Sequence, residues 1–266
     1  MRAFRSEFLK FRRWSMLAGS GVMIASTAFI AYLTFRQITS GATGPELTPL
    51  IQAFATAQGL ITVVGQARSL IIVIALIMVT SNLAAEWSQG TLRNLLVREP
   101  NRLRLLAGKM LALVLYVLIS AALTLAIGAV LIFVVAHAQG ISTVAWTSSE
   151  GMRTLLAFFG NEMLCLVGIS LLGMLIAVFT RSVGAAVGVA LAYVLVPEGV
   201  IAMVWPDGSR WFPVRLFNFL PGSTVPAAVG PTPPQGYTAA LLVALLWMTS
   251  FAVVSAVVFR RQDINA

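Results

Sequence analysis

One acidic residue lies inside a long apolar run and is the first candidate for chemistry. Glu162 sits between residues 154 and 180, a stretch apolar enough to cross a membrane. An ionisable side chain at that depth is costly, so it is a candidate proton-linked or substrate-binding group, as in a secondary transporter or channel. The same carboxyl could instead be structural, bonded to Asn82, Asn161 or a neighbouring hydroxyl, or protonated. Both interpretations stay open here.

The other reactive residue types are too few to build an enzyme site. The chain has one cysteine, Cys165, and one histidine, His137, so we predict no metal site built from these ligands. Gly108-Lys109 lacks the upstream glycine and the following Ser/Thr of a nucleotide-binding P-loop. No nucleophile motif of the G-x-S-x-G kind occurs either. We therefore expect a non-catalytic chain that binds no cofactor of its own.

Composition favours a membrane environment. Of the 266 residues, 59% are hydrophobic and 10% are charged, and the mean hydropathy is +0.91. Soluble domains carry about 25% charged residues. The net charge of +9 would suggest nucleic acid binding in a soluble protein. Here the basic residues lie beside the apolar runs, where they orient the chain and meet anionic lipid. We expect membrane lipid as a partner and no nucleic acid.

Apolar runs of about 20 residues, the length that crosses a hydrocarbon core, define the predicted spans. The six runs cover residues 15–35, 67–85, 110–136, 154–180, 182–204 and 238–259. Backbone groups inside lipid must be satisfied within each segment, which makes these runs helices. We expect the short second span to extend upstream with Arg68 snorkelling outward, and the fifth to break near Glu198, after Pro197. The predicted fold is an all-α integral membrane protein with a six-helix transmembrane domain at 15–259.

The distribution of Lys and Arg predicts the orientation of these spans. Of the 18 basic residues, 13 lie on the side that holds the N-terminus, the loop 86–109 and the tail 260–266, and 5 on the other side. The positive-inside rule places both termini in the cytoplasm. The first run is long for the core of a signal peptide, so we expect no cleavage. Arg outnumbers Lys by 16 to 2, which hints at a bacterium, and we expect the inner (plasma) membrane.

The first 14 residues form a basic amphipathic pattern. Phe4, Phe8 and Phe11 share one face of a helix, while Lys10 and the arginines occupy the rest, with Glu7 at the margin. This pattern predicts a helix lying in the cytoplasmic interface. It could be a simple anchor or a contact for a cytoplasmic partner, and both interpretations stay open.

The loop at 86–109 is too polar to cross the membrane and too apolar for an idle linker. Gly90 and Pro100 bracket a short helical piece. Leu92, Leu95 and Leu96 can form one face of it. Such a helix can dock into a groove on another protein or lie on lipid, and composition does not decide between these.

The loop resembles that of the type-two ABC export permeases. The residues that carry the resemblance are Glu86, Gly90, Thr91, Leu92, Leu95, Leu96, Pro100, Arg102, Gly108 and Lys109. The two ends of the chain are also similar to the family, through Glu7, Lys10, Phe259, Arg260, Arg261, Asp263 and Ile264. Gln262 is a departure, since the family often runs straight on there.

The resemblance implies a role for the loop and a set of partners. The loop would be a coupling helix seated in a nucleotide-binding ATPase subunit, with its leucines facing that subunit, and residues 1–14 would be the connecting helix. ATP and Mg would bind to the ATPase, present in two copies. A second permease chain, identical or a sister subunit, would complete an exporter, whose substrate the sequence leaves open.

The segment 205–237 is rich in Pro and Gly yet carries many aromatic residues. Among them are Trp211, Phe212, Phe217 and Phe219. Aromatics at this density belong at a membrane interface, and the resemblance implies an external gate; an aromatic anchor is the alternative. Before this segment, Gly184 and Gly188 form a Gly-x-x-x-Gly pattern, for which we expect internal helix packing.

Overall fold

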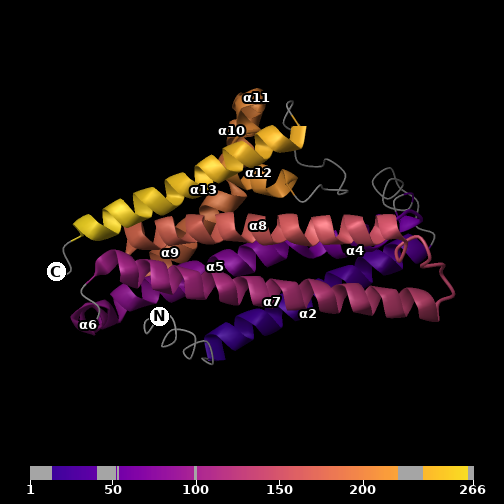
Figure 1. Ribbon diagram of the computed structural model, residues 1–266, viewed down its shortest axis with the longest axis horizontal. Helices are drawn as coiled ribbons and strands as arrows, with labels where there is room; N and C mark the ends of the chain where they lie inside the picture. The colour runs from indigo at the N-terminus through magenta and orange to yellow at the C-terminus, as the bar shows by residue number, and fades with distance from the viewer. Residues whose placement is uncertain (1–13, 41–51, 53, 99–100, 221–235, 263–266) are drawn as a thin grey trace.

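The described part of the chain is helical throughout. The computed structural model describes residues 14–40, 52, 54–98, 101–220 and 236–262, and these contain helices and no strand. The elements are α2 (Trp14–Thr39), α4 (Gly59–Val64), η1 (Gly65–Ala67), α5 (Arg68–Ser88), α6 (Thr91–Arg98), α7 (Arg102–Ala138), α8 (Ser149–Thr180), α9 (Val183–Leu195), α10 (Pro197–Val204), α11 (Pro206–Ser209), α12 (Pro213–Phe219) and α13 (Gly236–Arg261). The long helices run side by side along one axis (Figure 1). The prediction of an all-α protein is confirmed for these residues.

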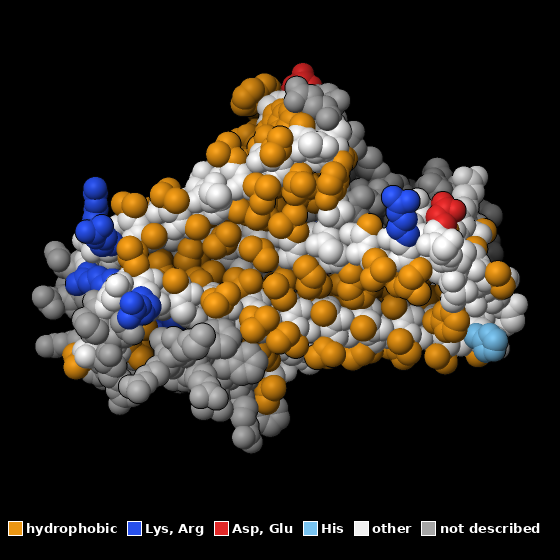
Figure 2. All heavy atoms as spheres, viewed as in Figure 1, with side chains coloured by type: hydrophobic (Ala, Val, Ile, Leu, Met, Phe, Trp, Pro, Cys, Tyr) orange, Lys and Arg blue, Asp and Glu red, His pale blue; other side chains and the backbone are white. Residues whose placement is uncertain are grey.

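Five helical stretches are long and apolar enough to cross a membrane. They are Met16–Thr39, Gly59–Ser88, Arg102–Ala138, Ser149–Thr180 and Gly236–Arg261. Each coincides with one predicted span, and the second extends upstream through α4 and η1 as expected. The face of the bundle seen in Figure 2 is apolar along its length, and several Lys and Arg side chains gather at the end that holds α6. Phe29 is 61% and Leu246 65% exposed. Lipid is the solvent that such a surface fits, so the protein is membrane-embedded.

The predicted fifth span, 182–204, is divided in two. α9 ends at Leu195 and α10 begins at Pro197. Proline has no N–H to continue the hydrogen-bond ladder and its ring clashes with the preceding turn, so a new helix begins with proline in its first turn. A break was predicted near Glu198, after Pro197, and the structure has it two residues earlier, at Val196. The count of six spans stays a prediction, because α9 alone is 13 residues long.

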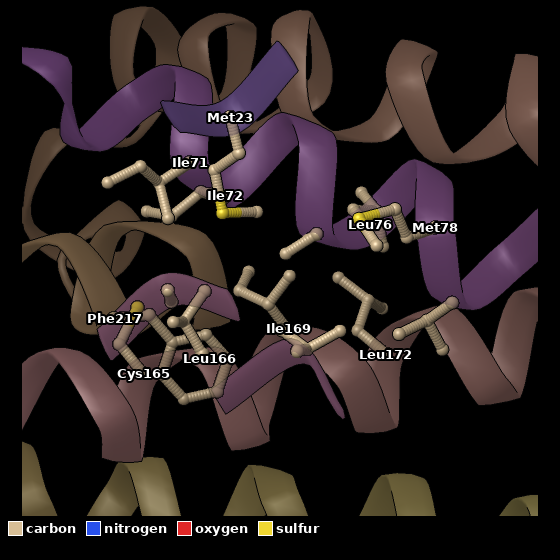
Figure 3. Packing of buried hydrophobic residues seen from close by; sticks show 14 of the residues in the cluster. Met23, Ile71, Ile72, Leu76, Met78, Cys165, Leu166, Ile169, Leu172 and Phe217 are labelled. Atoms are coloured by element: carbon tan, nitrogen blue, oxygen red, sulfur yellow. The ribbon is translucent and has the colours of Figure 1, made fainter. Parts of the chain in front are cut away.

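α5 lies at the centre of the bundle and packs most extensively against α8. Figure 3 shows side chains of α5, such as Ile71 and Leu76, interleaved with Ile169 and Leu172 of α8. Gly173 of α8 makes this close approach possible, because a Cβ there would lie 3.2 Å from a methyl carbon of Leu76. α5 also contacts α2, α7 and α9.

The glycines of α9 do not serve internal packing, so that expectation was wrong. Gly184 and Gly188 are exposed, and a Cβ added at either would meet no atom within 4 Å. The helix instead buries Ala186 and Ala190 against the bundle. A pattern of two glycines four residues apart defines a helix face, but the neighbours of that face depend on how the helix is rotated.

Several predicted residues lie outside the described part of the chain. They are Phe4, Glu7, Phe8, Lys10 and Phe11 of the interfacial helix, Pro100 of the loop, and Asp263 and Ile264 of the tail.

Candidate functional site

The intramembrane acid Glu162 has a basic partner. Its carboxylate accepts a hydrogen bond from Nε of Arg68, the first residue of α5. Neither side chain reaches the surface, since Glu162 is 0% and Arg68 6% exposed. The expectation that Arg68 snorkels outward was wrong. A buried carboxylate offers the guanidinium a compensating charge, so the side chain turns into the bundle instead of towards water.

The same guanidinium also holds the end of α12. Arg68 donates from Nη1 to the backbone oxygen of Asn218 at 2.8 Å, and from Nη2 to that of Phe217. Nη2 also lies 3.4 Å from Sγ of Cys165. The last carbonyls of a helix lack intrahelical partners and carry the negative end of its dipole. The guanidinium of Arg68 donates hydrogen bonds to these carbonyls, and its positive charge is favourable at the negative end of the dipole. Arg68 therefore joins α5, α8 and α12.

An acid binds the opposite end of α12. The carboxylate of Glu198 in α10 accepts from the backbone N–H of Val214 at 3.0 Å and of Arg215 at 2.8 Å. The hydroxyl of Tyr193 donates to the same carboxylate at 3.2 Å. Glu198 therefore caps α12 from a distance in the chain. This short helix has an anion at its N-terminus and a cation at its C-terminus, a role that the sequence pattern did not reveal for either residue.

Phe217 fixes the position of α12 against α8. Its side chain is 0% exposed, and its ring lies over Gly168, where a Cβ would come within 2.4 Å of a ring carbon. Figure 3 shows this ring beside Cys165 and Leu166. Phe217 thus lies in the core and is not an aromatic residue of the membrane interface.

The other aromatic residues of the predicted outer segment are less buried. Trp211, Phe212 and Phe219 are half-buried. The backbone oxygen of Trp211 accepts a hydrogen bond from the indole of Trp247 at 2.9 Å, which ties this segment to α13. The external gate stays a prediction.

A second ion pair, partly buried, closes the base of the loop. Lys109, 3% exposed in the second turn of α7, donates through Nζ to the carboxylate of Glu86 in the last turn of α5. Between these helices α6 forms the predicted short helix. Gly90 precedes it with φ of +64°, a conformation that side chains disfavour and glycine accepts. The loop is therefore a helix mounted on two joined helix ends, not a free linker.

The faces of α6 differ from those expected for a partner-binding helix. Leu92 is 3% exposed and packs in the core of the chain itself, and Leu95 is half-buried against it. The expectation that Leu92 faces a partner is contradicted by this burial. Val97 is 82% exposed instead. Sequence periodicity identified an apolar face but not the side on which it would be covered, and Val97 follows Leu92 by five residues, off that face.

Arg102 also binds within the chain. Its Nη1 donates to the backbone oxygen of Gln262 at 2.5 Å, just after the end of α13. Thr91 Oγ1 lies 3.4 Å from the backbone oxygen of Glu86. Several residues named for coupling to a partner therefore brace the loop from inside.

In the described ranges, no three His, Cys, Asp or Glu side chains come together as metal ligands. The site consists of two ion pairs, both formed by α5, one fully buried and one partly buried. They lie at positions 68 and 86, about 27 Å apart along the helix at about 1.5 Å per residue. Each pair fixes one end of α5 against a neighbouring helix.

Fold and site together define a membrane-embedded helical protein. At one end, an ion pair closes the base of its loop, and the short helix α12 is bound by a charged residue at each of its ends. The chain belongs to the protein family of unknown function DUF2705, whose profile matches residues 22–265. No curated protein matches it.

Proposed function

We propose that this chain is the permease subunit of an ATP-driven ABC exporter, coupled to a separate nucleotide-binding subunit through the loop 86–109. The observation that carries the proposal is the way in which α6 is attached to the ends of α5 and α7. The helix follows the turn at Gly90, its base is closed by the Glu86–Lys109 ion pair, and it leaves Val97 82% exposed. A force applied to such a helix moves the ends of α5 and α7 instead of being lost in a flexible loop.

The rest of the complex follows from this role. Two copies of the ATPase bind ATP and Mg, and this chain pairs with a second permease chain, identical or a sister subunit. Closure of the ATPase pair on ATP pushes on α6, and the bundle moves between inward-open and outward-open arrangements. In this proposal α9 and α10 together make the fifth of six spans, both termini are cytoplasmic, and the membrane is the bacterial inner membrane. α12 and the aromatic segment around it form the outer gate.

The test is co-purification of the tagged chain from its native membrane in mild detergent, with intact-complex mass and an ATPase assay. We expect an ATPase subunit in equal stoichiometry with two permease chains. Recovery of the chain without any ATPase under several gentle conditions contradicts the proposal.

Two matched pairs of variants localise the contact. Val97→Asp places a charge on the exposed position of α6, and Val144→Asp does the same at a 75% exposed valine beyond α7. Gly90→Pro replaces a residue with φ of +64°, and Gly140→Pro one with φ of +72°; proline, fixed near about −65°, fits neither turn. We expect only the loop variants to release the ATPase. Equal loss from both members of a pair means that the loop is not the contact.

The alternative is a secondary transporter or channel that uses Glu162. The burial of this acid within the bundle favours it, since a buried ionisable group marks an ion pathway in many transporters. The purified chain alone in liposomes, under an imposed pH gradient and with an internal pH-sensitive dye, decides the question. Proton flux abolished in Glu162→Gln supports the alternative, and the absence of any flux in the native chain contradicts it.

A further inference from the structure

We propose that the C-terminal end of α13 is a relay from the loop to the last membrane helix, with Phe259 and Gln262 as positioning residues. The relay extends the proposed function and takes its purpose from it. The loop has two roots, the end of α5 at 86–88 and the start of α7 at 101–109. The end of α13 lies at the same end of the bundle as α6 (Figure 1) and contacts both roots.

The first contact is between aromatic rings. Trp87 of α5 meets Phe259 of α13 edge to face, with ring centroids 5.8 Å apart and an interplanar angle of 88°. Phe259 is 1% exposed. α13 packs against α8, α12 and α7 through one stripe of residues from Ala240 to Phe259, and much of its remaining surface is exposed. The buried ring at the end of this stripe attaches α13 to the end of α5 as well.

The second contact is a chain of hydrogen bonds through Gln262. Its backbone oxygen accepts from Arg102 Nη1 at 2.5 Å, and its side-chain Nε2 donates to the backbone oxygen of Val178 at 2.8 Å. Val178 lies in the last turn of α8, where carbonyls lack intrahelical partners. Gln262 is 6% exposed, so these bonds are shielded from water. One residue thus links α7, α8 and α13.

α13 therefore contacts each root of the loop separately, the first through Phe259 and the second through Gln262. A displacement of α6 that shifts the end of α5 carries Phe259, and one that shifts the start of α7 carries Gln262. α9 also meets the first root, through a hydrogen bond from the backbone N–H of Val183 to Ser88 Oγ at 3.3 Å. The contacts of α13 involve both roots, and Gln262, a departure from the resembled family, has a specific place in them.

The test is hydrogen exchange of the full chain in lipid nanodiscs, read by mass spectrometry over residues 255–262. The loop is perturbed by Gly90→Pro, and the relay is cut by the double variant Arg102→Met/Phe259→Leu, which removes the donor to the backbone oxygen of Gln262 and the ring that meets Trp87. We expect Gly90→Pro to raise exchange at the end of α13 about tenfold in the native background and less than about twofold in the double-variant background, within the usual range of coupling between sites. Arg153→Met/Phe179→Leu, at two exposed positions of α8, is the matched control and should leave the response intact.

A response of α13 that is equal in both backgrounds, or absent in both, overturns the relay. Where Gly90→Pro does not fold, Gly90→Ala strains the same turn more mildly and serves in its place. No ATPase is present in this experiment. Failure here therefore leaves the exporter proposal standing, and failure of co-purification leaves the mechanical link standing without its proposed purpose.

Discussion

Arg68 and Glu162, 94 residues apart in sequence, form a buried ion pair that joins the first turn of α5 to α8. The sequence alone does not predict this pair: it favours a snorkelling arginine, and it leaves the acid either bonded to Asn82, Asn161 or a hydroxyl, or active in transport. Each charge offsets the free energy lost when the other is removed from water, since a buried charge is tolerated when an opposite charge and hydrogen bonds compensate it. The remaining N–H groups of Arg68 then bind α12.

Removing one member of this pair should cost more than removing both. We expect Arg68→Met or Glu162→Leu alone to destabilise the fold by about 3–5 kcal/mol, because each leaves an uncompensated buried group. The double variant should recover a large part of that loss. Thermal unfolding of the four proteins in detergent measures the cycle, with Arg153→Met as a control at an exposed arginine. Additive losses would mean that the two charges do not stabilise each other.

Gly168 should not tolerate a side chain. Gly168→Ala places a methyl within 2.4 Å of the Phe217 ring, and this ring cannot move freely because it is fully buried and its backbone oxygen is bonded to Arg68. We expect a loss of about 1–3 kcal/mol from overpacking. Gly160→Ala on the same helix meets no atom within 4 Å and should gain up to about 1 kcal/mol from helix propensity. Unfolding midpoints of both variants check this, and equal behaviour would mean that the ring does not lie over Gly168.

The cap that Glu198 provides should depend on an acceptor more than on a charge. Glu198→Ala leaves the N–H groups of Val214 and Arg215 without their acceptor, and we expect about 1–2 kcal/mol of local destabilisation. Glu198→Gln keeps one acceptor oxygen and should lose less. Hydrogen exchange of a peptide covering α12 measures both effects. If the exchange of α12 is unchanged in Glu198→Ala, the carboxylate does not hold this helix.

The Glu86–Lys109 pair should control access to the loop. Lys109→Met leaves the Glu86 carboxylate without this partner, and Glu86→Gln leaves a buried ammonium without its counter-charge; we expect about 3 kcal/mol of local destabilisation in either case. Cleavage by trypsin after an arginine of this loop requires local unfolding, which opening of the base would make easier. The measurement is the initial rate of cleavage in this loop, which should rise more than about tenfold for each variant. A rate equal to that of the native chain, with unchanged unfolding, contradicts the brace.

Local sequence signals predicted the elements of this protein well. Long apolar runs predicted the five stretches that are long enough to span a membrane, because hydrophobicity and helix length are properties of a continuous segment. Proline predicted a break in the fifth span to within two residues and glycine the turn before α6, because both act through their own backbone angles. The short second span extended upstream for the same reason, since the residues before Arg68 are also apolar.

Contacts between elements were decided by the tertiary structure alone. The partner of Glu162, the buried side of Leu92 and the outward side of Gly184 depend on the rotation and depth of each helix against its neighbours, which no local pattern fixes. Phe217 shows the difference most clearly: by composition it belonged with interfacial aromatics, yet it lies 0% exposed over Gly168. The sequence by itself determined which segments are helices in a membrane, because burial in lipid is local, whereas only the fold decided which charges meet, because ion pairs join residues far apart in the chain.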